Sequence, residues 1–313
     1  NLLDKILSFS NSLTSSIFPT SILDTLRKMS ENTFISLLID EELSKIPWEF
    51  IDADKYDKGL ILKNPVGRII LTDSITSEIR RDNSNNIRFL IILGPDEINE
   101  GKINTSKPYW DMTLSIKKIL QTELSQKGIE SKILEYPNIG KESVFNEIKK
   151  GIYDVIHFIG HGSVYRDNGK QSTALITADR NDSAELGMIT PQDLDQVLKN
   201  TPQTPFLFFA QACSVGKHFN SEYSQTSNLG LASIFIKHNV IFIGAHWEVS
   251  ERGSDIFVRS LYSELINRPD KPIGELMKIA RLKVIQELAS NKPNYEWLAF
   301  TLNGDPSSRL IWK

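Results

Sequence analysis

The stretch PFLFFAQAC, residues 205–213, decides the class of fold that we expect for this chain. It is apolar at nearly every position, so the strand that it predicts is buried on both faces, which is typical of a parallel sheet covered by helices. The stretch ends at Cys213, the single cysteine of the chain. A cysteine in such a place can be a small buried hydrophobe or, at the carboxyl edge of a sheet, a nucleophile. The rest of the sequence has to distinguish the two roles.

Strands and helices alternate through the remainder of the second half of the chain. Further apolar runs predict strands at 87–94, 129–136, 153–162 and 239–247. Segments with apolar residues at helical spacing predict helices at about 111–127, 141–150, 191–199, 227–238, 252–267 and 273–290. This alternation predicts an α/β fold with a mostly parallel central sheet and helices on both faces.

A polar stretch, RRDNSNNIR at residues 80–88, separates this half from the N-terminal part. Residues 1–30 show helical spacing with many serines and threonines, and the segments that follow predict short strands around turns. We therefore divide the chain into an N-terminal helical and β-hairpin part, residues 1–85, and a second part, residues 86–313. Because the sequence begins at Asn1 and not at a methionine, we expect it to be a piece of a longer protein.

The composition argues against several classes of protein. The 36 basic and 39 acidic residues leave a net charge of −3, whereas binding to nucleic acid needs a concentrated positive surface. No apolar run approaches the roughly 20 residues that a membrane helix needs. A single cysteine cannot form an internal disulfide, and no charged-then-apolar leader opens the sequence. We therefore expect a cytoplasmic protein with neither nucleic acid nor a membrane as its direct partner.

Three of the predicted strands end in small or reactive residues. The three ends read Gly160-His161-Gly162, Ala212-Cys213-Ser214 and Ala245-His246-Trp247. Because the carboxyl ends of parallel strands share one edge of a sheet, we expect these residues to gather there. A thiol nucleophile needs a nearby imidazole, and glycines beside a histidine let a substrate backbone approach. As a structural alternative, His161 can be a loop histidine whose ring is satisfied by its neighbours.

His157 competes with His161 for the role of base. Four residues along a strand span about 13 Å, so the two histidines cannot share a metal ion. His157 lies inside the apolar run and is interpreted as a structural core histidine, and His246 is given a supporting role. No spacing of His, Cys and carboxylates resembles a zinc site, and Gly94-Pro95-Asp96 lacks the glycine pattern of a dinucleotide loop. We therefore expect no metal and no cofactor.

The spacing of the histidine and the cysteine points to a peptidase. The caspase signature reads Q-A-C-[RQG]-G with a histidine about 50 residues upstream. Here the stretch from Gln211 to Gly216 reads QACSVG, with one residue more between Cys and Gly, and His161 lies 52 residues before Cys213.

From about residue 34 to its end the chain resembles the CHAT peptidases, caspase-like cysteine proteases of the same clan as separase and the metacaspases. The segments that carry the resemblance, in order, are EELSKIPWEF (41–50), YDVIHFIGHG (153–162), LFFAQACSVG (207–216), NLGLASIFIKHNVIFIGAHWEV (228–249) and WLAFTLNGDPSSRL (297–310). The combination of these segments is specific, although each of them alone is not.

The resemblance implies a caspase-like α/β sandwich with His161 and Cys213 as a catalytic dyad. By matching position, the backbone N–H groups of Gly162 and Cys213 would hold the oxyanion. The segment His246-Trp247-Glu248 resembles the stretch that pairs with substrate as an added strand. Trp247 can equally be a core aromatic residue.

One departure bears on specificity. Metacaspases and separase carry an aspartate two residues before the cysteine, where it helps to hold a basic P1 side chain. This chain has Gln211 there, so we do not predict strict cleavage after Arg or Lys. Caspases also have a glutamine there and hold an acidic P1 residue with arginines, for which Arg68 and Arg252 are the candidates here. The P1 preference stays open.

The function that the resemblance implies is a cysteine endopeptidase that cleaves specific protein substrates. Relatives occur beside repeat domains, CRISPR effectors or cyclic-nucleotide-sensing domains, so we expect a regulatory sensor as a second partner and a role in bacterial antiviral defence. The alternative is a catalytically silent, caspase-like scaffold that binds partner proteins. Neither the physiological substrate nor the activating signal follows from the sequence.

Overall fold

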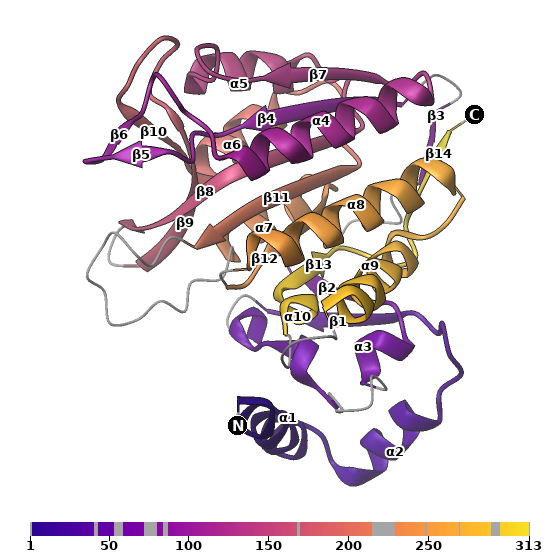
Figure 1. The fold of residues 1–313 in the computed structure, drawn as a ribbon. Helices are drawn as coiled ribbons and strands as arrows, with labels where there is room; N and C mark the ends of the chain where they lie inside the picture. The colour runs from indigo at the N-terminus through magenta and orange to yellow at the C-terminus, as the bar shows by residue number, and fades with distance from the viewer. Residues whose placement is uncertain are drawn as a thin grey trace.

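A mostly parallel sheet forms the centre of the protein (Figure 1). The computed structural model describes residues 2–40, 43–52, 59–71, 80–83, 87–167, 170–214, 229–247, 249–268, 270–288 and 295–312. Within these residues the main path of the sheet runs β1-β2-β13-β12-β11-β8-β4-β7, and β9 and β10 extend it beside β8. From β7 to β12 every neighbouring pair on this path is parallel.

The strands of this sheet are β1 (Ile35–Ile39), β2 (Val66–Ile70), β4 (Arg88–Leu93), β7 (Glu130–Leu134), β8 (Val155–Asp167), β9 (Lys170–Ala178), β10 (Leu186–Ile189), β11 (Leu207–Ser214), β12 (Ile241–Ala245) and β13 (Phe300–Asn303). Two short ribbons pair β3 (Arg80–Asn83) with β14 (Arg309–Trp312) and β5 (Ile98–Asn99) with β6 (Lys102–Ile103). The predicted strands are all present. The sequence did not predict β9 and β10, or the continuation of β8 beyond residue 162.

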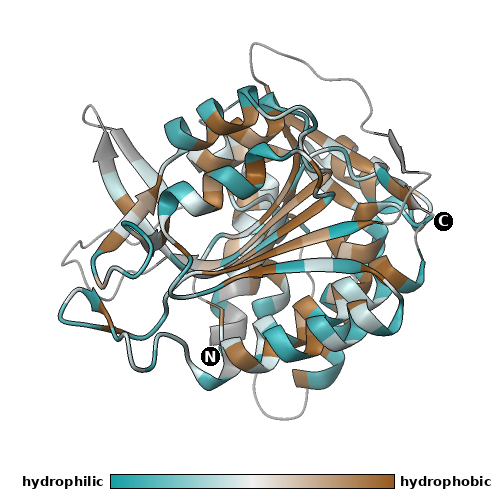
Figure 2. Cartoon of the chain, turned by 90° about the horizontal axis from the view of Figure 1, so that it is seen from above, coloured by the Kyte–Doolittle hydropathy of each residue, from teal (hydrophilic) through white to brown (hydrophobic). Residues whose placement is uncertain are grey.

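Helices cover both faces of the sheet. One face packs against α4 (Asp111–Gln126), α8 (Glu251–Asn267), α9 (Ile273–Leu288) and α10 (Glu296–Ala299), and the other against α5 (Lys141–Lys149), α6 (Pro191–Lys199) and α7 (Leu229–Lys237). Successive side chains of a strand point to opposite faces, so Phe208 joins one core and Phe209 the other. Figure 2 shows the apolar strands between helices whose outer surfaces are hydrophilic. The predicted α/β architecture is confirmed.

The N-terminal part contributes to the same sheet. Its elements are α1 (Leu2–Ile17), α2 (Thr20–Lys28), η1 (Leu43–Lys45), η2 (Trp48–Phe50) and α3 (Leu60–Lys63), together with β1 and β2. The expected β-hairpin is wrong: β1 and β2 pair in parallel, which requires a crossover between them, and η1, η2 and α3 form that connection. The two parts of the chain share their sheets, because β2 pairs with β13 and β3 pairs with β14 from the far end of the chain. The boundary at residue 85 stays a prediction.

Candidate active site

Cys213 and His161 are register partners on neighbouring parallel strands. The pairing of β11 with β8 sets Cys213 opposite His161 and Ser214 opposite Gly162. Strands in a sheet lie about 4.8 Å apart, so the two backbones meet within one strand spacing at the carboxyl edge. The structure describes the backbone of Cys213; its side chain lies outside the described part.

The His161 ring is oriented by a backbone carbonyl. Its Nε2 lies 3.1 Å from the carbonyl oxygen of Asp96, in the loop that follows β4. A carbonyl oxygen can only accept, so Nε2 carries the proton and Nδ1 is the basic nitrogen of the neutral ring. This role was not predicted from the sequence, in which Gly94-Pro95-Asp96 was weighed only as a dinucleotide loop, because a backbone carbonyl leaves no signal in residue type.

The carboxylate of Asp96 holds the start of α4. It accepts the backbone N–H of Trp110 at 2.7 Å and the hydroxyl of Thr113. Asp96 is buried, and burial raises its pKa to about 6 against the opposing effect of these two hydrogen bonds. One residue therefore fixes both the histidine, through its carbonyl, and the N-cap of α4, through its side chain.

Glycines allow two backbones to approach closely behind the histidine. Gly160 has φ +158°, and a Cβ there would lie 3.0 Å from the Cα of Gly94. The N–H of Gly94 donates to the carbonyl of Ile159 at 2.8 Å, which brings the end of β4 against β8. Gly160 thus serves the packing that positions Asp96. Gly162 is buried, and its oxyanion role stays a prediction.

His157 is a core residue, as the sequence indicated. Its ring is fully buried, stacks on Phe209 with the ring centroids 4.8 Å apart, and contacts Tyr262. Burial lowers the pKa of His157 to about 3, and a small opposing effect of the nearby Gln211 amide does not offset it. The ring is therefore neutral, and within the described residues neither of its nitrogens has a partner at hydrogen-bond distance.

Gln211 lies on β11, two positions before the candidate nucleophile. Its amide nitrogen donates to the hydroxyl of Ser254 in α8 at 2.9 Å, and only 8% of the residue is exposed. Its amide oxygen has no hydrogen-bond partner among the described residues. Its role in substrate binding stays a prediction.

His246 and Trp247 follow β12 at the same edge. The backbone N–H of His246 donates to the carbonyl of Ala299 at 2.9 Å, so the pairing with the β13 side continues one residue past the strand. Burial and the positive charge of Arg68 lower the pKa of His246 to about 3, so this imidazole is neutral. Trp247 is half-buried against Phe50, with the ring centroids 5.6 Å apart, which favours a packing role. Glu248 lies outside the described residues.

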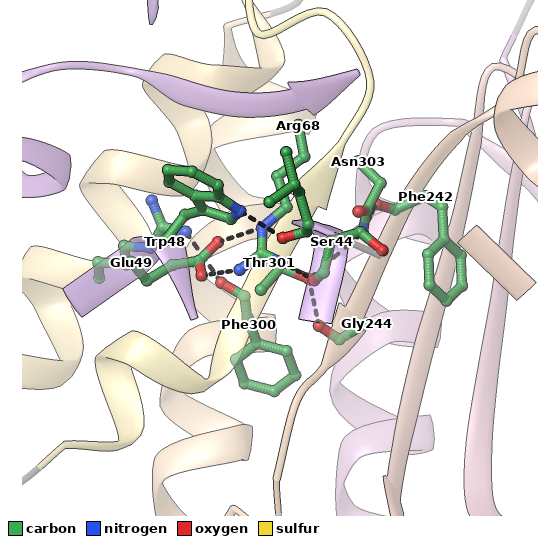
Figure 3. Close-up of polar contacts among 11 residues, drawn as sticks. Ser44, Trp48, Glu49, Arg68, Phe242, Gly244, Phe300, Thr301 and Asn303 are labelled. Carbon is green, nitrogen blue, oxygen red and sulfur yellow. Dashed lines mark hydrogen bonds and ion pairs between the residues drawn. The ribbon is translucent and has the colours of Figure 1, made fainter. Parts of the chain in front are cut away.

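A buried ion pair joins the N-terminal part to the sheet (Figure 3). Arg68 donates through Nε to Glu49 at 3.1 Å, through Nη2 to the same carboxylate, and through Nη1 to the carbonyl of Ser44 at 2.8 Å. Burial disfavours the charge on Glu49, but Arg68, His246 and Arg281 together outweigh it and keep the pKa of Glu49 below its ordinary value. Arg68 is thus engaged in structure, and Arg252 is exposed in the first turn of α8.

Arg281 of α9 stands beside this ion pair. Its Nη2 donates to the carbonyl of Phe300 at 2.9 Å, while Nε and Nη1 have no hydrogen-bond partner among the described residues. Burial lowers the pKa of Arg281 to about 10, so the group stays charged at neutral pH. Glu49 is therefore the carboxylate that balances two buried cations.

Neither a metal cluster nor a membrane helix is found in the part of the chain that the structure describes. No three His, Cys, Asp or Glu side chains among these residues are grouped so that they could hold a metal ion. No helix among the same residues combines the length and the apolar character that crossing a bilayer requires.

Comparison with protein families gives one assignment over nearly the whole chain. The sequence model of the CHAT domain matches residues 9–305. The comparison with curated proteins found no match.

The solved structures with a similar fold include a cysteine proteinase. The crystal structure of the Arg-specific cysteine proteinase gingipain R (RgpB) has a TM-score of 0.58 at 15% identity, over 96% of this chain and 70% of that chain. The complex of Porphyromonas gingivalis RgpB pro- and mature domains has a TM-score of 0.57 at 13% identity, over 96% and 72%. The Saccharomyces cerevisiae separase–securin complex has a TM-score of 0.50 at 12% identity, over 90% and 16%. At these identities the likeness shows the fold alone, and the expected caspase-like fold is confirmed.

Proposed function

Because this chain belongs to the CHAT domain family and has a caspase-like fold, we propose that it is a cysteine endopeptidase with Cys213 as its nucleophile and His161 as its base. The observation that carries this proposal is the register of β11 and β8, which makes the two residues partners at the carboxyl edge. The hydrogen bond between His161 and the Asp96 carbonyl supports it, because the bond holds the ring in one orientation and puts the proton of the neutral ring on Nε2.

The reaction follows from these two groups. His161 takes the thiol proton, the sulfur of Cys213 bonds to the scissile carbonyl carbon, and the oxyanion is held by backbone N–H groups, for which Gly162 and Cys213 are the candidates. The C–N bond breaks as His161 returns the proton to the leaving amine. Water, with His161 as its base, then hydrolyses the thioester to a carboxylic acid and the free thiol.

The substrate in this proposal is an extended peptide segment of a protein. The stretch that begins at His246 and Trp247 would pair with the acyl half of the substrate as an added strand, with Gln211 at the base of the P1 site. The amide oxygen of the buried Gln211 has no partner within the part of the chain that the structure describes, which favours an uncharged or donor-bearing P1 side chain. It does not by itself define one residue type.

A cytoplasmic location, control by a sensor protein and a role in antiviral defence belong to the same proposal. The single cysteine and the weak net charge are compatible with them. An activating partner would be a protein encoded with this chain, and its addition would raise the rate at which Cys213 reacts.

Labelling by a peptidyl thiol-reactive inhibitor tests the proposal. The chain should be compared with Cys213→Ala and His161→Ala, with and without the protein that its neighbouring gene encodes. Loss of label in both variants, with unchanged unfolding transitions, is the expected result. The matched control is His157→Leu, which changes a histidine on the same strand and should label at the full rate.

Two other outcomes would contradict the proposal in different ways. Labelling that needs Cys213 but ignores His161 would indicate an exposed thiol without a base. No labelling in any condition would favour the second candidate function, a caspase-like scaffold that binds partner proteins without cleaving them.

A further inference from the structure

Trp110 is an exposed aromatic residue fixed against the candidate base. Its ring meets the ring of His161 edge-on, with centroids 5.3 Å apart and an interplanar angle of 86°. Its backbone N–H is held by Asp96, and its indole Nε1 donates to Glu97 at 2.7 Å. With these contacts 38% of the residue is still exposed. The indole is therefore a rigid apolar surface that faces solvent beside His161.

The packing of α4 does not account for this exposure. The side of α4 that faces the core carries Ile116, Leu120 and Leu124, all buried. Leu114, one turn after Trp110, is 41% exposed and continues the apolar surface, since residues four apart lie on the same side of a helix. An aromatic ring that is held in one orientation beside a candidate base, with an apolar neighbour on the same side, is suited to contact a bound ligand.

The order of the strands indicates which half of a substrate would meet this surface. Along the sheet edge the order is β12, β11, β8 and β4, so Cys213 and the His246 segment lie on one side of His161. Asp96 follows β4 and holds Trp110 at the start of α4. Figure 1 shows β4 and α4 on the side of β8 away from β11. In the proposed reaction His161 delivers a proton to the leaving amine, so the leaving-group half of the substrate lies over His161 and extends away from Cys213.

We propose that Trp110 is a specificity-determining residue: it receives the side chain that follows the scissile bond and favours substrates with an apolar, above all aromatic, residue at that position. Two aromatic rings in contact gain affinity through both buried area and edge-to-face attraction. The inference rests on the proposed function, since it assigns a substrate position to the same site.

Two peptidyl Michael acceptors test the inference without a known substrate. Both carry the same randomised tripeptide on the acyl side, and beyond the electrophilic carbon one carries a benzyl amide and the other a methyl amide. The rate constant for modification of Cys213 is measured by mass spectrometry. We expect the benzyl compound to react on the order of three- to tenfold faster, the advantage that one aromatic contact confers.

Variants assign that advantage to the indole. Trp110→Ala should react equally with the two compounds, Trp110→Phe should keep most of the preference, and Ile152→Ala should keep all of it. Ile152 is a matched control because it is 43% exposed and lies just before β8, at the opposite edge of the sheet.

The possible results separate this inference from the proposed function. An equal rate with both compounds in the unmodified chain, or a preference that survives Trp110→Ala, would overturn the role of Trp110 and leave the peptidase proposal intact. Failure of both compounds to modify Cys213 would contradict the proposed function itself, and the inference would fall with it.

Discussion

The carbonyl oxygen of Asp96 lies 3.1 Å from Nε2 of His161. The two residues are 65 positions apart in the chain, and the loop after β4 and the end of β8 bring them together. The contact defines the tautomer of the histidine and couples its orientation to the cap of α4. Several expected properties of the protein depend on this arrangement and on the buried charges beside the sheet.

The buried carboxyl of Asp96 should make stability depend on pH. Its pKa is raised from 3.8 to about 6, so between these values the folded chain holds a proton that the unfolded chain has lost. The stability from this group is therefore complete below about pH 4 and is lost as the pH rises through about 6. Asp96→Asn keeps an acceptor for the Trp110 N–H and does not titrate. As the pH rises from about 4 to about 6, the free energy of unfolding of the unmodified chain should therefore fall, relative to that of the variant, by at most about 3 kcal/mol. Urea unfolding at a series of pH values measures this, and a pH-independent difference would contradict it.

His157→Leu should leave labelling of Cys213 unchanged and should not lower stability. Among the described residues neither nitrogen of the buried ring has a partner at hydrogen-bond distance, and an unsatisfied buried polar group costs about 1–3 kcal/mol. An apolar side chain of similar size removes that cost while keeping the contacts with Phe209 and Tyr262. Denaturant unfolding and the labelling rate together check this, and loss of labelling in a folded variant would mean that His157 takes part in catalysis.

Removing the Glu49 carboxylate should destabilise the protein strongly. Glu49→Gln leaves the buried charges of Arg68 and Arg281 with no carboxylate partner among the described residues, and breaking a buried pair costs about 3–5 kcal/mol. The control is Arg27→Ala, which breaks an ion pair with Asp52 in which Arg27 is 53% exposed and should cost about 1 kcal/mol or less. Chemical denaturation measures the free energy of unfolding of both variants. Equal losses would show that the buried ion pair contributes no more to stability than the exposed one.

Gly160→Ala should displace the end of β8 from the loop after β4. The added methyl carbon would lie 3.0 Å from the Cα of Gly94, and backbone cannot move aside as a flexible side chain can. We expect a loss on the order of 2 kcal/mol and a slower labelling of Cys213, because His161 is the next residue. Gly101→Ala is the control: its φ of +77° strains an alanine there, but nothing lies within 4 Å of the added carbon, so it should lose stability without slowing the labelling. A labelling rate lowered equally in both variants would mean that strain alone, and not the contact with Gly94, slows the reaction.

Gln211→Asp should turn the P1 preference toward arginine. Among the described side-chain contacts, a carboxylate at this buried position has only Ser254 as a partner. A guanidinium of the substrate would pair with this carboxylate through charge-assisted hydrogen bonds. Inhibitors that differ only in arginine or leucine at P1 measure the change as a ratio of labelling rates. Gln211→Asn is the matched control, and an unchanged ratio in the Asp variant would place P1 elsewhere.

The buried strands could be predicted from the sequence, because runs such as residues 205–213 are apolar on both faces and helices with one apolar side separate them. The sequence also placed the ends of the strands that carry His161 and Cys213 at one edge, since parallel strands share the direction of their carboxyl ends. Local pattern did not show that β1 and β2 pair in parallel within the same sheet, because side-chain periodicity is the same in parallel and antiparallel strands.

Three features became visible only in the folded chain: the register that sets Cys213 opposite His161, the carbonyl of Asp96 at the histidine, and the pairing of Glu49 with Arg68. Every residue has a backbone carbonyl, so the residue type does not indicate which carbonyl orients a histidine ring. Register and long-range charge pairing depend on the order in which distant strands meet, and the local pattern of apolar and polar residues carries no information about that order.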